Sequence, residues 1–187
     1  MAKKDGNDDH DYREGWRHAA ELAAWLRDGG QPPTVATPLV LAPGEVVHAT
    51  APVEVAMYHG MDVEYGGGAF VGGASWKGFA ATAAASAMYN SHQRRKAESQ
   101  SMAQWRSYGV QWVTVTSTRF LFMVEGEMIA YGLYDGTILA FEPNWQEFAA
   151  TLHVNGGSPI GMRGPGVPYL SVLLSSFLFR QIPELTP

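Results

Sequence analysis

The sequence contains no cysteine, and only 17% of its 187 residues are charged, against about 25% in an average globular domain. Without cysteine there is no disulfide scaffold and no thiolate metal site, and the chain suits a reducing compartment. The net charge of −5 argues against a general nucleic-acid binder, which would present a basic surface. The hydrophobic fraction of 46% is enough for one core and excludes a disordered chain.

Targeting and membrane-spanning signals are also lacking. Residues 1–14 are rich in acidic side chains, and no apolar run follows a basic start, so no secretory signal is predicted. The one stretch that approaches bilayer length, residues 66–89, is mostly Gly, Ala and Ser, with Lys77 at its middle, and is a poor membrane span. We therefore expect a cytoplasmic protein, with association at the inner face of the membrane as the alternative.

Charge and glycine are distributed unevenly along the chain. The first 76 residues carry a net charge of −6, residues 77–119 carry +5, and the remaining residues carry −4. The basic segment follows a Gly-rich run at residues 66–73. Composition thus marks one Gly/Ala-rich and then basic segment between two acidic flanks.

Residues 11–30 predict an N-terminal helix. Apolar side chains recur at helical spacing from Trp16 to Leu26, and a glycine pair followed by two prolines ends the pattern. The preceding residues 1–10 are polar and charged, and we expect them to form a disordered tail. The helix is expected to pack on the rest of the protein, with docking to a partner as the alternative.

After a linker at residues 31–37, the pattern is that of a mainly β domain over residues 38–182. Val, Thr and aromatic residues alternate in short runs separated by Gly-containing turns, which predicts antiparallel strands. Residues 60–108 interrupt this pattern and are expected to be an insertion. The predicted fold class is α+β and mainly β, with a bent antiparallel sheet or partly closed barrel.

Three turns carry specific predictions about the strands. A turn at 42–45 separates an expected strand at 39–41 from a longer one at 46–58. Asp135-Gly136 is expected to be the two-residue turn of a hairpin, because both central positions of such a turn need positive φ. A second hairpin turn is expected at residues 155–157.

The end of the chain predicts an amphipathic helix. Pro168 suits the first helical turn, and an apolar stripe follows, formed by Leu170, Leu173, Leu174 and Phe177. A sheet of short strands leaves open ends and edges that need cover. We therefore expect the helix to cap the sheet with its stripe in the core; membrane anchoring or partner binding is the alternative.

Three segments carry a resemblance to a known group of domains. They are the entry to the first long strand at 41–47, a strand pair at 113–122 with the pattern V-T-x-x-R-hydrophobic, and the closing helix at 165–179. Together they resemble the pleckstrin-homology-like (PH-like) superfold, and within it the bacterial PH/GRAM-like group, over about residues 38–182. The resemblance implies a strongly bent seven-stranded antiparallel barrel closed by the C-terminal helix. The insertion at 60–108 departs from a compact domain of this kind.

Arg119 lies in the strand pair that carries the resemblance. An arginine at this point of a strand turn typically braces the turn or pairs with a carboxylate on a neighbouring strand. The resemblance makes Glu45 the candidate partner, and we expect a structural role for this pair.

The insertion holds the candidate residues for contact with a partner or an anionic membrane. They are aromatic anchors and nearby cations: Phe70, Trp76, Lys77, Phe79, Arg94, Arg95, Lys96 and Arg106. The alternatives are a plain Gly-rich loop or strand and, for the three adjacent cations, a solvated helix end.

No sequence motif indicates catalysis, a cofactor or a metal. The Gly-rich run lacks the G-x-x-x-x-G-K-[ST] pattern of a phosphate-binding loop, and Ser75 lacks the flanking glycines of a nucleophile elbow. The histidines are too scattered to predict a metal site, and the acidic flanks disfavour nucleic acid. We expect no cofactor and no enzymatic activity.

The function that we expect is that of a PH-like adaptor, which binds a protein partner through a sheet edge, a groove at the barrel mouth or the insertion. Three alternatives stay open. They are peripheral binding to an anionic membrane through residues 66–96, self-assembly into a homo-oligomer, and an enzyme whose site forms only on folding.

Overall fold

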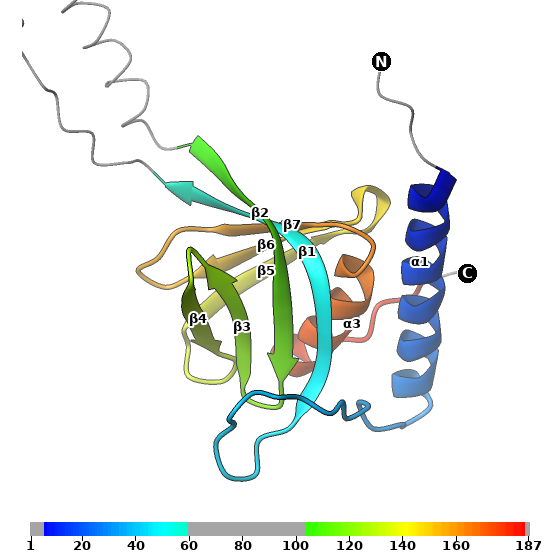
Figure 1. The fold of residues 1–187 in the computed structure, drawn as a ribbon. Helices are drawn as coiled ribbons and strands as arrows, with labels where there is room; N and C mark the ends of the chain where they lie inside the picture. Colours follow the sequence, from blue (N-terminus) through cyan, green and yellow to red (C-terminus); the bar gives the residue numbers. More distant parts are fainter. Residues whose placement is uncertain (1–5, 60–103, 186–187) are drawn as a thin grey trace, which may run out of the picture. The chain divides into compact units, whose positions relative to one another are not determined.

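The structure is a computed structural model that describes residues 6–59 and 104–185 (Figure 1). Backbone contacts divide the chain into two compact units, Met1–Tyr58 with Arg106–Pro187, and His59–Trp105. The first unit combines an antiparallel sheet of seven strands with a helix near each end of the chain. The predicted α+β, mainly β class is therefore confirmed.

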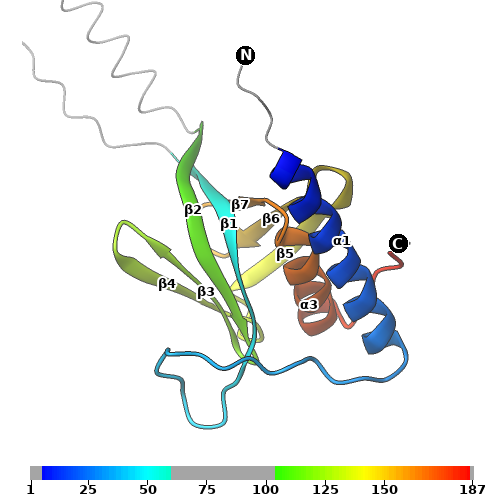
Figure 2. The same ribbon diagram turned by 45° about the vertical axis from the view of Figure 1, so that its right-hand side comes forward.

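The seven strands form one sheet in the order β4-β3-β2-β1-β7-β6-β5, which curls into a half-barrel (Figures 1 and 2). The strand bounds are β1 (Val47–His59), β2 (Gln104–Thr116), β3 (Arg119–Val124), β4 (Glu127–Gly132), β5 (Ile138–Asn144), β6 (Ala149–Val154) and β7 (Ile160–Arg163). Strand β1 is central, between β2 and β7. Strand β2 begins within the range expected for the insertion and is joined to β1 by a hydrogen bond that Ser107 donates to Glu54 (3.1 Å).

The strand expected at residues 39–41 is not formed, so this prediction is wrong. The turn that follows it is present, because the backbone N–H of Glu45 donates to the carbonyl of Ala42 (3.0 Å). Residues 39–41 pair with no strand in the described ranges, and Val40 is 98% exposed. A strand needs a partner for its backbone groups, and local β propensity does not supply one.

The hairpin expected at Asp135-Gly136 is also wrong: of its two central residues only Gly136 has positive φ, and the chain bends there without joining paired strands. Gly136 has φ +78°, and the Asp135 carboxylate accepts the backbone N–H of Thr137 (2.9 Å). The strands on either side, β4 and β5, lie at opposite edges of the sheet. By contrast, residues 155–157 do join the paired strands β6 and β7, as predicted.

Helix α1 (Gly6–Arg27) packs on the rest of its unit, as expected. It begins before residue 11, so the predicted disordered tail at 1–10 is wrong for residues 6–10. Acidic side chains such as Asp9 and Asp11 suit the first turns of a helix because its N-terminal end carries partial positive charge. The apolar side of α1 is buried in the common core and lies against the C-terminal helix α3 (Figure 2), through Ala19, Ala20, Leu22, Ala23 and Leu26.

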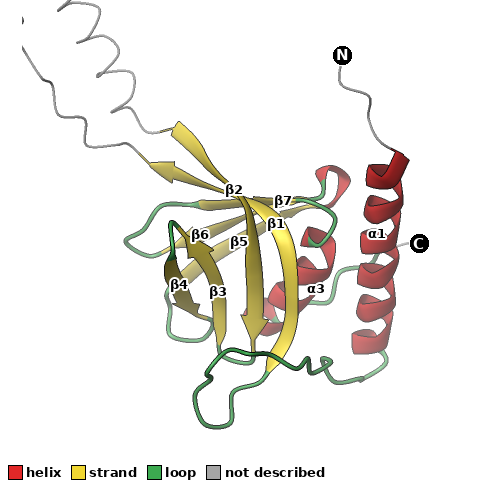
Figure 3. Cartoon of the chain, viewed as in Figure 1, coloured by secondary structure: helices red, strands yellow, loops and turns green. Residues whose placement is uncertain are grey.

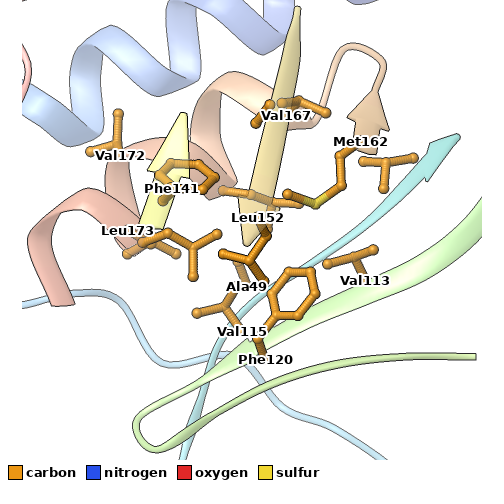
Figure 4. Close-up of a cluster of buried hydrophobic side chains, with 14 of the residues drawn as sticks. Ala49, Val113, Val115, Phe120, Phe141, Leu152, Met162, Val167, Val172 and Leu173 are labelled. Atoms are coloured by element: carbon orange, nitrogen blue, oxygen red, sulfur yellow. The ribbon is translucent and has the colours of Figure 1, made fainter. Parts of the chain in front are cut away.

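Helix α3 (Val167–Phe179) covers one side of the half-barrel (Figure 3). Leu170, Leu173 and Leu174 are buried as predicted, whereas Phe177 is only partly buried. Figure 4 shows side chains of β1, β2, β3, β5, β6, β7 and α3 meeting in the core, among them Ala49 and Phe120. Among the described residues, no helix is long and apolar enough to cross a membrane.

Gly15 sits where α1 passes closest to the loop before α3. A Cβ at this position would overlap the backbone carbonyl of Pro165, and backbone atoms have little freedom to move aside. In an ordinary helix, Gly→Ala stabilises by about 1 kcal/mol. Here we expect Gly15→Ala to destabilise the protein by about 1–3 kcal/mol in urea unfolding, because α1 must shift.

The control for this prediction is Arg13→Ala, an exposed position in the same turn of α1. It is expected to change the free energy of unfolding by less than about 0.5 kcal/mol. A Gly15→Ala variant more stable than the wild type would contradict the close approach of α1 to Pro165.

Candidate functional site

A surface groove of about 940 Å³ lies between the start of α1, the middle of β1 and the corner where the short helix η1 (Trp145–Glu147) meets β6. We call it the α1–η1 groove. Its apolar lining comes from Tyr12, Pro52, Val53, Val110, Phe148 and Pro165, and its charged lining from Asp9, Glu54, Glu147 and Arg163. These residues come from widely separated parts of the sequence, so the groove exists only in the folded chain.

An aromatic cluster forms one side of the groove. The Phe148 ring lies edge-on to Tyr12, with centroids 4.8 Å apart and planes at 88°, and it is 6.0 Å from the Trp16 ring. Tyr12 and Phe148 also line an adjoining hollow of about 630 Å³, which Asp9, Arg13, Trp16 and Arg17 help to form. Aromatic surfaces of this kind provide a large contact area with little loss of side-chain freedom on binding.

Phe148 has an unusual backbone conformation. Its φ of +51° lies in the left-handed region, which is about 1–2 kcal/mol less favourable for a residue with a Cβ. The surroundings hold it there, because its carbonyl accepts the N–H of Gly164 (2.9 Å) and its own N–H donates to Trp145 (3.4 Å). Backbone strain of this kind concentrates at functional positions, and here it places an aromatic ring against α1.

The groove carries an excess of negative charge. Three carboxylates, Asp9, Glu54 and Glu147, line it together with one guanidinium, Arg163. Arg163 is the register partner of Glu54 in the pairing of β1 with β7. Among the described residues, no group of three or more His, Asp or Glu side chains is placed to hold a metal ion. The lining of the groove offers a binding partner apolar contact area and charged side chains.

A separate polar cluster surrounds Glu45, whose side chain is 1% exposed. Its carboxylate accepts hydrogen bonds from Thr116 (2.5 Å), Thr118 (3.0 Å), the backbone N–H of Ala42 (3.0 Å) and both Nε and Nη2 of Arg119 (2.9 and 2.6 Å). The Arg119 guanidinium and these hydroxyl and backbone donors lower the pKa of Glu45 from 4.5 to about 2, although burial opposes them. The predicted pair of Arg119 with Glu45 is confirmed, and it ties the turn at 42–45 to the β2–β3 hairpin.

Two of the described histidines, His48 and His153, have close neighbours. His48 is buried, with Nδ1 2.7 Å from the carbonyl oxygen of Pro33 and its ring 5.1 Å from that of Phe177. His153 lies 3.4 Å from the carboxylate of Glu142 on the neighbouring strand. The contacts of His48 agree with the expected structural role, whereas Nε2 of His153 is buried without a hydrogen-bond partner among the described residues.

Most residues predicted to bind a partner or membrane fall outside the described ranges: Phe70, Trp76, Lys77, Phe79, Arg94, Arg95 and Lys96. Their roles stay predictions. Arg106 lies on β2, partly buried, and is not among the residues that line the α1–η1 groove.

The sequence alone did not identify the residues that form the groove. Phe148 fits an alternating strand pattern there, and nothing local shows that it would meet Tyr12. A large residue with positive φ leaves no mark in the sequence, since that conformation is favoured by glycine and asparagine.

No protein-family model matches the chain, and a comparison with curated proteins finds no match. The groove geometry and the fold therefore provide the basis for a functional assignment.

Proposed function

We propose that this protein is a non-enzymatic adaptor of PH-like architecture that binds a protein partner in the α1–η1 groove. The observation that carries the proposal is the groove itself, with its aromatic side held by the strained backbone of Phe148. Enzymes and adaptors both use clefts, but aromatic contact area with scattered surface charge is typical of a protein-binding surface.

Three features of the fold support the PH-like architecture. The sheet consists of two successive antiparallel sets, β1–β4 and β5–β7, joined through the pairing of β1 with β7. It curls into a half-barrel, and a helix follows the last strand. These features agree with the resemblance of the sequence to that superfold.

The exposure of the groove favours a polypeptide over a small molecule. Val110 is 70% exposed, and Asp9, Gln146, Glu147 and Arg163 are exposed as well. Small-molecule sites enclose about 70–90% of their ligand. A metabolite bound against these exposed residues would stay largely in water, whereas an extended or helical segment can cover them.

The test compares two exposed aliphatic residues on strands. Val110 lines the groove, whereas Leu139, 60% exposed on β5, does not. We expect the Leu139→Asn variant to capture the same partner from native cells as the immobilised full-length wild type, and in equal amount. Val110→Asn should reduce its capture at least about tenfold, equivalent to about 1.4 kcal/mol.

Both variants should keep the wild-type thermal unfolding midpoint, because neither side chain is buried. Quantitative mass spectrometry of the captured proteins, with unfolding curves for each bait, makes the comparison. A set of captured proteins that does not differ between the two variants would argue against groove binding.

A further inference from the structure

We infer that the segment bound in the α1–η1 groove carries Lys or Arg next to an apolar or aromatic anchor. This inference rests on the proposed function and adds the chemistry of the partner. It follows from the presence of carboxylates beside an aromatic surface in the groove.

The charge of the groove is the first observation. Its three carboxylates come from three different elements, Asp9 from α1, Glu54 from β1 and Glu147 from η1, so the negative charge is not confined to one segment. Arg163 is aligned with Glu54. Within the described part of the chain, neither Asp9 nor Glu147 makes an ion pair. These two carboxylates are therefore available to a cationic partner.

The aromatic cluster is the second observation. Tyr12 and Phe148 line both the groove and the adjoining hollow that contains Trp16, so an anchor side chain in the hollow lies next to the acidic groove. A guanidinium or ammonium group bound nearby would meet carboxylates and aromatic rings together, and both attract cations. An acidic segment would meet like charge there and would be disfavoured.

The charges at the far side of the aromatic cluster give the bound segment a direction. Arg17, which lines the hollow, is already held by Glu14 (3.0 Å) and Glu21 (2.6 Å) on its own helix. Arg13 and Asp9 also line the hollow, whereas Glu54 and Glu147 line only the groove. The cation of the partner should therefore lie on the η1 side of Phe148, and the anchor side chain on the Trp16 side.

The experiment measures binding of three matched fluorescent peptides, blocked at both ends, to the full-length protein by fluorescence anisotropy. One peptide places Lys and Arg around a central Trp, the second replaces each cation with Glu, and the third keeps the cations but replaces Trp with Ser. We expect the first to bind at least about tenfold more tightly than the other two, and its affinity to fall as salt rises.

The charge variants separate a specific site from general attraction to an acidic protein. Glu147→Lys should weaken binding of the first peptide about tenfold or more, whereas Glu127→Lys, an exposed carboxylate on β4 outside the groove, should change it less than about twofold. Equal loss in both variants would overturn the inference, since their net charges are the same.

The outcomes distinguish this inference from the proposed function. Equal or tighter binding of the acidic peptide, abolished by Val110→Asn, would overturn the cationic partner and leave groove binding supported. Failure of the first peptide to bind at about 1 mM would overturn the inference. The proposed function would then still be decided by whether capture of a partner depends on Val110. A dimer that Val110→Asn dissociates would show a second copy in the groove, and would also overturn the inference.

Discussion

A Glu45→Gln variant is expected to lose about 3 kcal/mol of the free energy of unfolding at neutral pH. The side chain of Glu45 is almost fully buried, and its charge is balanced by Arg119 and by donors from Thr116, Thr118 and Ala42. The amide of Gln has one donor group where all of the surrounding groups donate, and it leaves Arg119 without a counter-charge. Urea unfolding followed by circular dichroism measures the loss.

The control is Glu127→Gln, which removes a carboxylate from an exposed position on β4. Its effect should be below about 0.5 kcal/mol. If Glu45→Gln were equally mild, the Glu45 cluster would not brace the turn at 42–45 against the β2–β3 hairpin.

The same cluster predicts a pH dependence. The pKa of Glu45 is about 2 in the folded protein and 4.5 without its partners, so the folded state favours the ionised form. Its stabilisation is therefore complete above about pH 5 and is lost as the pH falls towards 2. The difference in unfolding free energy between the wild type and Glu45→Gln should shrink over that interval. A difference independent of pH would contradict an ionised Glu45.

The second large effect is expected in α3. Leu173 is 0% exposed in the core, and Leu173→Ala should lower the free energy of unfolding by about 2–5 kcal/mol, because it removes buried apolar surface and leaves a cavity. Phe177→Ala removes a larger side chain, but that side chain is only partly buried. Its effect should therefore be smaller than that of Leu173→Ala.

Thermal and urea unfolding of the two variants, side by side, tests this order. Retention of the far-ultraviolet circular dichroism spectrum shows that each variant still folds before its stability is compared. A larger loss for Phe177→Ala would mean that Phe177 is packed more deeply than its exposure indicates.

The two glycine-containing turns show how far local patterns extend. The chain bends at Asp135-Gly136, where Gly136 has positive φ, and residues 155–157 form a turn, because local backbone geometry depends on adjacent residues. Only the second joins paired strands. Which strands pair depends on burial throughout the sheet: the chain after Leu133 crosses to the far edge, where Phe141 is buried in the core.

The sequence by itself determined the class of fold, the two amphipathic helices and the leucines of the α3 stripe. It also indicated the pair of Arg119 with Glu45, through the resemblance to PH-like domains. Helical periodicity and turn chemistry act over a few residues, so they can be recognised without knowing the fold.

Only the tertiary structure formed the groove in which we propose that a partner binds. The α1–η1 groove brings Tyr12 from the first helix against Phe148 from the corner before β6, and it depends on a positive φ that Phe148 would not adopt alone. Contacts between distant segments and strained backbone conformations follow from the packing of the whole unit. For that reason the groove and its carboxylates left no signal in the sequence.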